Sequence, residues 1–184
     1  MLLNLEDIRR RLDVLAAHSE FDLQDLRLRG PGLRSSDFDR IEEVLRCKLP
    51  ASYREIASAV NFGYFTLGSV QFGSGRYSQA DALIAHNSPP LWWGDGERPA
   101  NFISIGGGDP YVILLRLSNG SILAFDSDLS WKTASVVASD IALFLRGLAT
   151  AYFLRKEKPA SSSAEALNRA VGGESSEFWQ IALS

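Results

Sequence analysis

Few side chains in this sequence belong to the types that perform chemistry. His18 and His86 are the only histidines, and Cys47 is the only cysteine. Neither histidine has a second histidine, a cysteine or a carboxylate at metal-ligand spacing, so we expect no metal site and no other cofactor. Cys47 follows an apolar helical pattern, where a small buried thiol is the common outcome. We therefore predict no catalytic residue and no enzymatic activity.

Two further segments match known ligand loops only in part. Gly106-Gly107-Gly108 precedes a predicted strand rather than a helix and has no Gly-Lys-Ser/Thr, so a structural turn is favoured over a phosphate loop. Asp126-Ser127-Asp128 lacks the glycine and the closing glutamate of a calcium loop. We expect both segments to be turns between strands.

The segment LWWGDGERP, residues 91–99, has the most unusual composition in the chain. Adjacent side chains on an extended segment point to opposite sides, so one tryptophan can enter the core while the other stays exposed. Tryptophan is enriched at the energetic centres of protein interfaces. Packing inside the protein, or stacking together with Tyr77 on a sugar or a base, are the alternatives. The interface interpretation places a binding face at four residues: Trp92, Trp93, Asp95 and Glu97.

The composition limits the class of protein. A chain of 184 residues suits one domain, and 46% hydrophobic with 22% charged residues is ordinary for a soluble protein. The net charge of −3 argues against a broad nucleic-acid-binding face. The lone cysteine permits no intramolecular disulfide, as is usual in a reducing compartment. No apolar run reaches the ~18 residues of a membrane span, and the start does not resemble a secretory signal. We expect a cytoplasmic protein without nucleic-acid or membrane partners.

The stretch from Ser35 to Gly63 predicts two short helices joined at Leu49-Pro50, because a residue before proline leaves the helical region. We expect Ser36 to cap the first helix and Gly63 to end the second with a positive φ. The expected apolar stripes are Phe38, Ile41, Val44 and Leu45 on the first helix, and Tyr53, Ile56, Ala57 and Val60 on the second. Helices this short are marginal alone and need a partner surface.

Strands follow the helix pair. We expect strands at 21–29, 101–105, 111–117, 121–126 and 131–137. Residues 63–73 predict one strand or a bent pair, with Gly68 at a bulge or turn. Asn119-Gly120 predicts a type I′ hairpin in which Leu117 faces Ile122 and Leu115 faces Ala124. The run Val112-Ile113-Leu114-Leu115 is apolar at every position, which favours a central strand covered on both faces.

Further helices are expected at 5–17 and 78–87, and from a cap at Ser139 to about Lys156. A polar linker then leads to a short helix with Leu167 and Val171. The final segment, 175–184, contains Phe178 and Trp179. It is too apolar for a free tail, so we expect it to dock on the body or on another chain.

Several of these elements together resemble the SUKH superfamily, which includes the yeast cell-wall-synthesis regulator family and many bacterial immunity proteins. The resemblance runs from Leu26 to Phe153. It departs from the usual pattern at Cys47, at Trp92-Trp93 and after Lys158. The motifs that carry it, in order, are the helix–Leu49-Pro50–helix unit, Phe102-Ile103-x-Ile105-Gly106, the Asn119-Gly120 hairpin ending at Asp126, and Ala138-Ser139-Asp140-Ile141-x-x-Phe144-Leu145.

The resemblance implies an α+β fold, with one mixed, mainly antiparallel sheet and helices packed against it in a single domain. Residues 1–158 would form the SUKH-like domain, with a core of about 26–153 and an N-terminal helix. Residues 159–184 would form a helical extension docked on the body.

The function implied is that of a cytoplasmic immunity protein, which neutralises a cognate bacterial toxin by stoichiometric occlusion and is a monomer or weak homodimer. No catalytic or interface residue transfers from the family. The alternatives are a regulatory or scaffolding module that binds a host protein, and a small-molecule or glycan-binding protein that uses the tryptophans.

Overall fold

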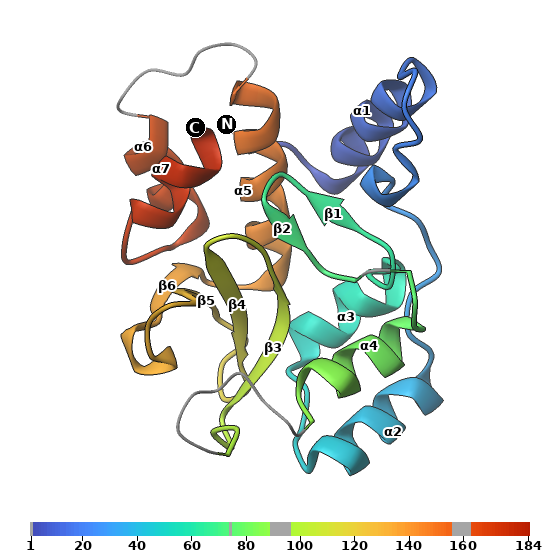
Figure 1. Ribbon diagram of the computed structural model, residues 1–184, viewed down its shortest axis with the longest axis vertical. Coiled ribbons are helices and arrows are strands. Elements are labelled where there is room, and N and C mark those ends of the chain that lie inside the picture. Colours follow the sequence, from blue (N-terminus) through green and yellow to red (C-terminus); the bar gives the residue numbers. More distant parts are fainter. Residues whose placement is uncertain (1, 74, 89–96, 156–162) are drawn as a thin grey trace.

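A computed structural model describes residues 2–73, 75–88, 97–155 and 163–184, and over these residues the chain forms one sheet with helices around it (Figure 1). Every strand pairing described is antiparallel, and the spatial order of the strands follows the chain. The predicted α+β class is confirmed. The strands are β1 (Thr66–Leu67), β2 (Val70–Gln71), β3 (Phe102–Gly107), β4 (Tyr111–Arg116), β5 (Ile122–Asp126) and β6 (Ser135–Ala138).

The helices lie in three places around this sheet (Figure 1). The first helix packs beside the long fifth one, the second to fourth form a group at one end of the sheet, and the last two pack on the fifth. Two single 3₁₀ turns, η1 (Gln24–Leu26) and η2 (Trp131–Thr133), connect elements. The α-helices are α1 (Leu5–Ala17), α2 (Ser35–Leu45), α3 (Ala51–Ala59), α4 (Gln79–His86), α5 (Ile141–Leu154), α6 (Ser163–Val171) and α7 (Glu177–Leu183).

Strand β4 occupies the middle of the sheet and is covered on both faces, as its unbroken apolar run predicted. Ile113 and Leu115 face the main core, which the helices cover. Leu114 faces the other side, where it packs in a second cluster with Leu123. Trp131 packs against this second cluster, so η2 covers part of this face of the sheet.

The hairpin between β4 and β5 forms at Asn119-Gly120, but its register differs from the prediction by two residues. Leu115 pairs with Ile122 rather than Ala124. Only Gly120 has a positive φ, and its N–H donates to the carbonyl of Arg116, which makes a wider loop than a type I′ turn. Asn119 instead uses its side-chain oxygen to accept a hydrogen bond from the N–H of Ser121, a local interaction that the I′ geometry would sacrifice.

The α2–α3 pair turns at Leu49-Pro50 as predicted. The cap of α2, one of its buried positions and the end of α3 differ from the prediction. Asp37 caps α2 from inside by accepting the N–H of Arg34, so Ser36 is not the cap. Val44 is 52% exposed, because the buried face of α2 includes Glu42 rather than Val44. Gly63 does not have a positive φ, and α3 ends through extended Val60.

Residues 21–29 form no strand in the structure, which is a second difference from prediction. They contain η1, and the following segment pairs with the end of α3 rather than with the sheet. The N–H of Gly32 donates to Ser58, and that of Leu33 to Ala57. A Cβ built on Gly32 would lie 2.0 Å from the carbonyl oxygen of Ala57, so this close approach requires glycine.

The last two helices pack against α5 (Figure 1). Trp179 of α7 is fully buried, and its indole N–H donates to the carbonyl of Val137 in β6. A Cβ on Gly147 of α5 would lie 2.5 Å from the Trp179 ring, so a glycine is needed where this ring meets α5. Asp140, not Ser139, caps α5 by accepting the N–H of Leu143. Most of the predicted linker, 156–162, lies outside the described residues.

Candidate partner-binding surface

The segment predicted to bind a toxin lies only partly within the described structure. Trp92, Trp93 and Asp95 lie outside the described residues, so the structure does not test their placement. Glu97 is described and is exposed. Position 97 therefore has the solvent access that a contact residue needs, and the binding role of all four residues stays a prediction.

Arg98 anchors the end of this segment to the body. One guanidinium nitrogen donates to the carbonyl of Phe102 at 2.8 Å, and the other donates to the carbonyl of Leu45 at 2.5 Å. The Leu45 carbonyl belongs to the last turn of α2, where no intrahelical donor remains. The contact joins residues 53 positions apart in the chain, so Glu97 is held beside the C-terminal end of α2.

The same end of α2 contains a buried carboxylate, Glu42. One of its oxygens accepts the backbone N–H of Leu49 at 3.0 Å and the guanidinium of Arg54 at 2.8 Å, and the other accepts the ammonium of Lys48 at 2.6 Å. Burial raises the pKa of Glu42, but these three donors together outweigh it and hold the pKa below its ordinary value. Because every oxygen is occupied, this carboxylate fixes the corner between α2 and α3 rather than serving as an acid or base.

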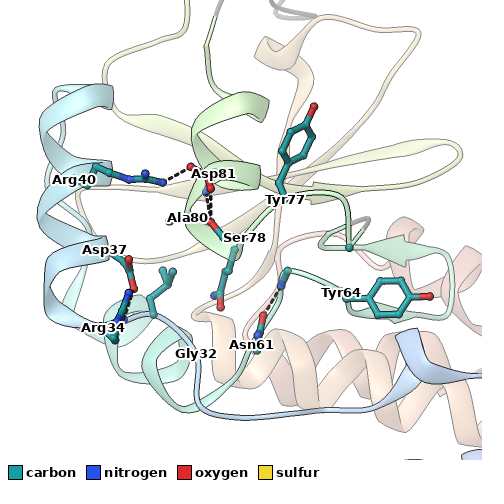
Figure 2. A pocket seen from close by; sticks show the side chains of 14 residues that line it. Gly32, Arg34, Asp37, Arg40, Asn61, Tyr64, Tyr77, Ser78, Ala80 and Asp81 are labelled. Carbon is teal, nitrogen blue, oxygen red and sulfur yellow. Dashed lines mark hydrogen bonds and ion pairs between the residues drawn. The ribbon is translucent and has the colours of Figure 1, made fainter.

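A polar cavity of about 520 Å³ lies at the opposite end of α2 (Figure 2). The N-terminal ends of α2 and α4 both line it, since the two helices run side by side in the same direction (Figure 1). Tyr64 and Tyr77 lie on one side of it (Figure 2), and both are large exposed side chains, with 46% and 59% of their surface accessible. The size is within the range of ligand and partner pockets.

The charged groups around this cavity are paired with one another. Asp37 accepts the backbone N–H and the side chain of Arg34, and these contacts lower its pKa. Asp81 accepts the hydroxyl of Ser78 and the guanidinium of Arg40, which likewise lower its pKa (Figure 2). The Arg40–Asp81 pair bridges α2 and α4. Since each carboxylate already has a cation, the cavity as a whole is close to neutral.

The sequence predicts no reactive centre. The positions of His86 and Cys47 in the structure bear on this prediction. His86 lines a separate cavity of about 350 Å³ beside Gly106 and Gly107, and burial lowers its pKa. Cys47 is half-buried at the end of α2, where burial raises the pKa of its thiol. The two residues line different cavities. Among the described residues, no group of three or more histidine, cysteine or acidic side chains has the arrangement of a metal site.

Sequence reasoning identified Tyr77 as an aromatic available for binding but did not identify Tyr64. Tyr64 stands among aromatic residues that are buried, such as Phe62 and Phe65, so its own exposure had no signature in the pattern. A Cβ on Gly75 would lie 2.7 Å from the Tyr64 ring. The glycine at 75 therefore leaves room for the ring at the rim of the cavity, a tertiary contact that spacing alone does not reveal.

Comparison with known proteins gives one family. The model of the SMI1 / KNR4 family (SUKH-1) matches residues 32–147, which is more than half of the chain. A comparison with curated protein sequences found no match. The matched region begins at the edge of the cavity and ends within α5, so it includes the sheet and the whole of α2, α3 and α4. Among the described residues no helix is long and apolar enough to cross a membrane.

Proposed function

The chain belongs to the SMI1 / KNR4 family (SUKH-1), and from that membership we propose that it is a cytoplasmic immunity protein that neutralises a cognate bacterial toxin. The SUKH family includes immunity proteins. The mechanism would be stoichiometric occlusion, in which the protein covers the active site of the toxin or a surface that the toxin needs. The family match is the observation that carries this proposal.

The chemistry of the described surface supports binding rather than catalysis. Glu42, Asp37 and Asp81 are engaged in hydrogen bonds within the protein. His86 and Cys47 line different cavities, and burial favours the neutral form of each. The engagement of these carboxylates supports the proposal that the protein acts on a partner through shape and complementary contacts.

We place the toxin contact at Trp92, Trp93, Asp95 and Glu97. Specific and stable protein interfaces bury on the order of 1,200–2,000 Å², with aromatic side chains at their centre. Arg98 supports this placement because it holds one end of the segment against α2 and β3. An anchored end lowers the conformational entropy that the segment loses on binding.

The direct test identifies a toxin domain among the products of the neighbouring genes and then co-expresses it with this protein. Cells that make the toxin domain alone should stop growing, and cells that also make this protein should grow. The two proteins should co-purify in a 1:1 complex. A toxin domain that remains lethal in the presence of the soluble, folded protein would contradict the proposal.

The site is tested by Trp93→Ala and Glu97→Ala, measured by calorimetric titration with the same toxin domain. Loss of a central aromatic anchor should weaken binding by about thirtyfold or more, and loss of a rim carboxylate by less. Phe21→Ala is a suitable control, since Phe21 is 79% exposed in a different part of the chain. Folded variants at 93 and 97 that bind as tightly as the wild type would remove this placement but not the proposed function.

A further inference from the structure

Gln79, the first residue of α4, has a buried polar side chain with no hydrogen-bonding partner in the part of the chain that the structure describes. Only 9% of the residue is exposed, and neither its amide nitrogen nor its amide oxygen has a hydrogen-bond partner among the described residues. Gln79 is also one of the residues that line the polar cavity between α2 and α4. A buried amide without hydrogen-bonding partners is destabilising. Its presence here points to a bound molecule that supplies the missing hydrogen bonds.

The surroundings of Gln79 fix its position. A Cβ on Gly63 would lie only 3.0 Å from the Gln79 backbone nitrogen, so the chain at 63 presses directly against the start of α4. Ser78, the residue before it, caps α4 by accepting the N–H of Asp81 at 3.1 Å. The amide of Gln79 is therefore carried on a rigid helix start. Both polar atoms of the amide are almost fully inaccessible in the free protein, so the side chain has to turn toward the cavity when a partner binds. The last torsion is a broad rotation, which then lets the amide oxygen or nitrogen face the partner.

The charges around the cavity restrict the chemistry of an occupant. Asp37 is paired with Arg34, and Asp81 is paired with Arg40 and Ser78. An incoming carboxylate or ammonium would have to displace one of these pairs, whereas a neutral polar group would not. The free Gln79 amide offers one acceptor and a donor group side by side. A peptide group, with one N–H and one C=O, is the neutral partner that matches this pair.

We infer that this cavity receives a loop of the protein partner, with a main-chain peptide group of that loop hydrogen-bonded to the Gln79 amide and flanked by Tyr64 and Tyr77. The inference rests on the proposed function and adds a second contact site to it. Tyrosine suits this role, because its ring gives a large contact area and its hydroxyl stays hydrated at the rim. The acidic net charge of the protein disfavours a nucleic-acid occupant for the same cavity.

Gln79→Leu is the decisive variant because it should lower the affinity for the toxin domain without lowering the stability of the free protein. In the free protein it removes an unpaired buried amide at similar volume, so the melting temperature should stay the same or rise. In the complex it removes the partner of the peptide group, so affinity for the toxin domain should fall about tenfold or more. Tyr77→Ala should weaken binding in the same direction. Gln180→Leu is the matched control, since Gln180 is an exposed residue of α7 on the other side of the molecule (Figure 1).

The outcomes separate the two proposals. If the wild type binds the toxin domain and the Gln79→Leu and Tyr77→Ala variants bind equally well, the cavity inference is wrong and the proposed function stands. If the wild type does not bind the toxin domain, the proposed function fails, and the cavity inference fails with it. If both variants lose affinity while Gln180→Leu does not, the inference is supported.

A second measurement identifies the chemistry of the occupant without the toxin. The full chain labelled with ¹⁵N is titrated with N-acetylglycine N-methylamide, a blocked peptide group. We expect saturable shifts of the Gln79 side-chain NH₂ signals and of the Tyr64 and Tyr77 backbone signals, and their loss in Gln79→Leu. Absence of saturable shifts at these residues, or shifts produced there by adenosine but not by the blocked peptide, would overturn the inference.

Discussion

Glu42 and Gln79 are both buried polar residues, and they differ in how their polar atoms are satisfied. Glu42 has a donor on each oxygen, including the backbone N–H of Leu49. Gln79 has no partner among the described residues. A fully satisfied buried group specifies the local fold, whereas an unsatisfied one lowers stability and is available to a ligand. This difference separates the structural corner of the protein from its candidate contact cavity.

Glu42→Gln should destabilise the protein by about 1–3 kcal/mol, because an amide cannot accept from Leu49, Lys48 and Arg54 as a carboxylate does. Chemical unfolding in urea measures this free energy. Glu43→Gln is the matched control, since Glu43 is the adjacent residue with the same side chain and is exposed. Equal stability of the two variants would show that the carboxylate does not fix the α2–α3 corner.

The contribution of Glu42 should also depend on pH. Its pKa in the folded protein lies below the ordinary value of 4.5, so the unfolded chain binds the proton more readily. The stabilisation is therefore present in full above about pH 4.5 and is lost as the pH falls through the lower folded pKa. The stability difference between wild type and Glu42→Gln should be large at pH 7 and small at pH 3. A difference that does not change with pH would contradict this account.

At the scale of elements, α7 docks on α5 through two buried aromatic residues, Phe178 and Trp179, which both contact Phe144 of α5. The Trp179 ring packs on Gly147, and its N–H reaches the carbonyl of Val137. Both interactions join the end of the chain to the sheet and to the central helix. We propose on this basis that residues 159–184 act as a docked extension of the domain rather than as an independent unit.

Trp179→Ala should cost about 3–5 kcal/mol, the usual range for removal of a buried aromatic side chain, and should expose the apolar side of α5. The melting temperature and the binding of a hydrophobic dye report these effects. Ile181→Ala on the same helix is a control, since Ile181 is 38% exposed and should lose little stability. A Trp179→Ala variant as stable as the wild type would show that α7 does not stabilise the body.

At the scale of the whole molecule, the exposed aliphatic and phenylalanine side chains of the described residues come from separate segments, whereas Tyr64 and Tyr77 lie together at the cavity. Phe21, Val44 and Leu129 belong to three separate parts of the chain. Single exposed apolar residues are normal on a monomer and do not form a large self-association face. We therefore propose that the protein is a monomer or weak homodimer that binds one partner molecule.

Sedimentation of the free protein at micromolar concentration should give the mass of a single chain, with only weak growth at higher concentration. Addition of the toxin domain should give a 1:1 complex. A stable dimer of the free protein at all concentrations would contradict this prediction and would point to a self-association face that the scattered residues do not explain.

The sequence by itself determined the type of most elements, because local patterns decide them, with the segment 21–29 as an exception. The unbroken apolar run at 112–115 predicted a central strand, and the Leu49-Pro50 corner predicted the helix pair; the structure has both. The order of these motifs also predicted the family, which the match over residues 32–147 confirms. Such features depend on backbone restrictions and periodicity within a short window, so the sequence contains them in full.

Only the tertiary structure decided the register of the β4–β5 hairpin, the absence of a strand at 21–29 and the cavity between α2 and α4. The hairpin register depends on a hydrogen bond from Ser121 to the Asn119 side chain. The cavity combines Tyr64 with Gln79 and with residues near 34, which are far apart in the chain. Burial and partner satisfaction are properties of several segments at once. No single window of sequence therefore shows that the amide of Gln79 lacks a partner among the described residues, or that Gln79, Tyr64 and Tyr77 line the same cavity.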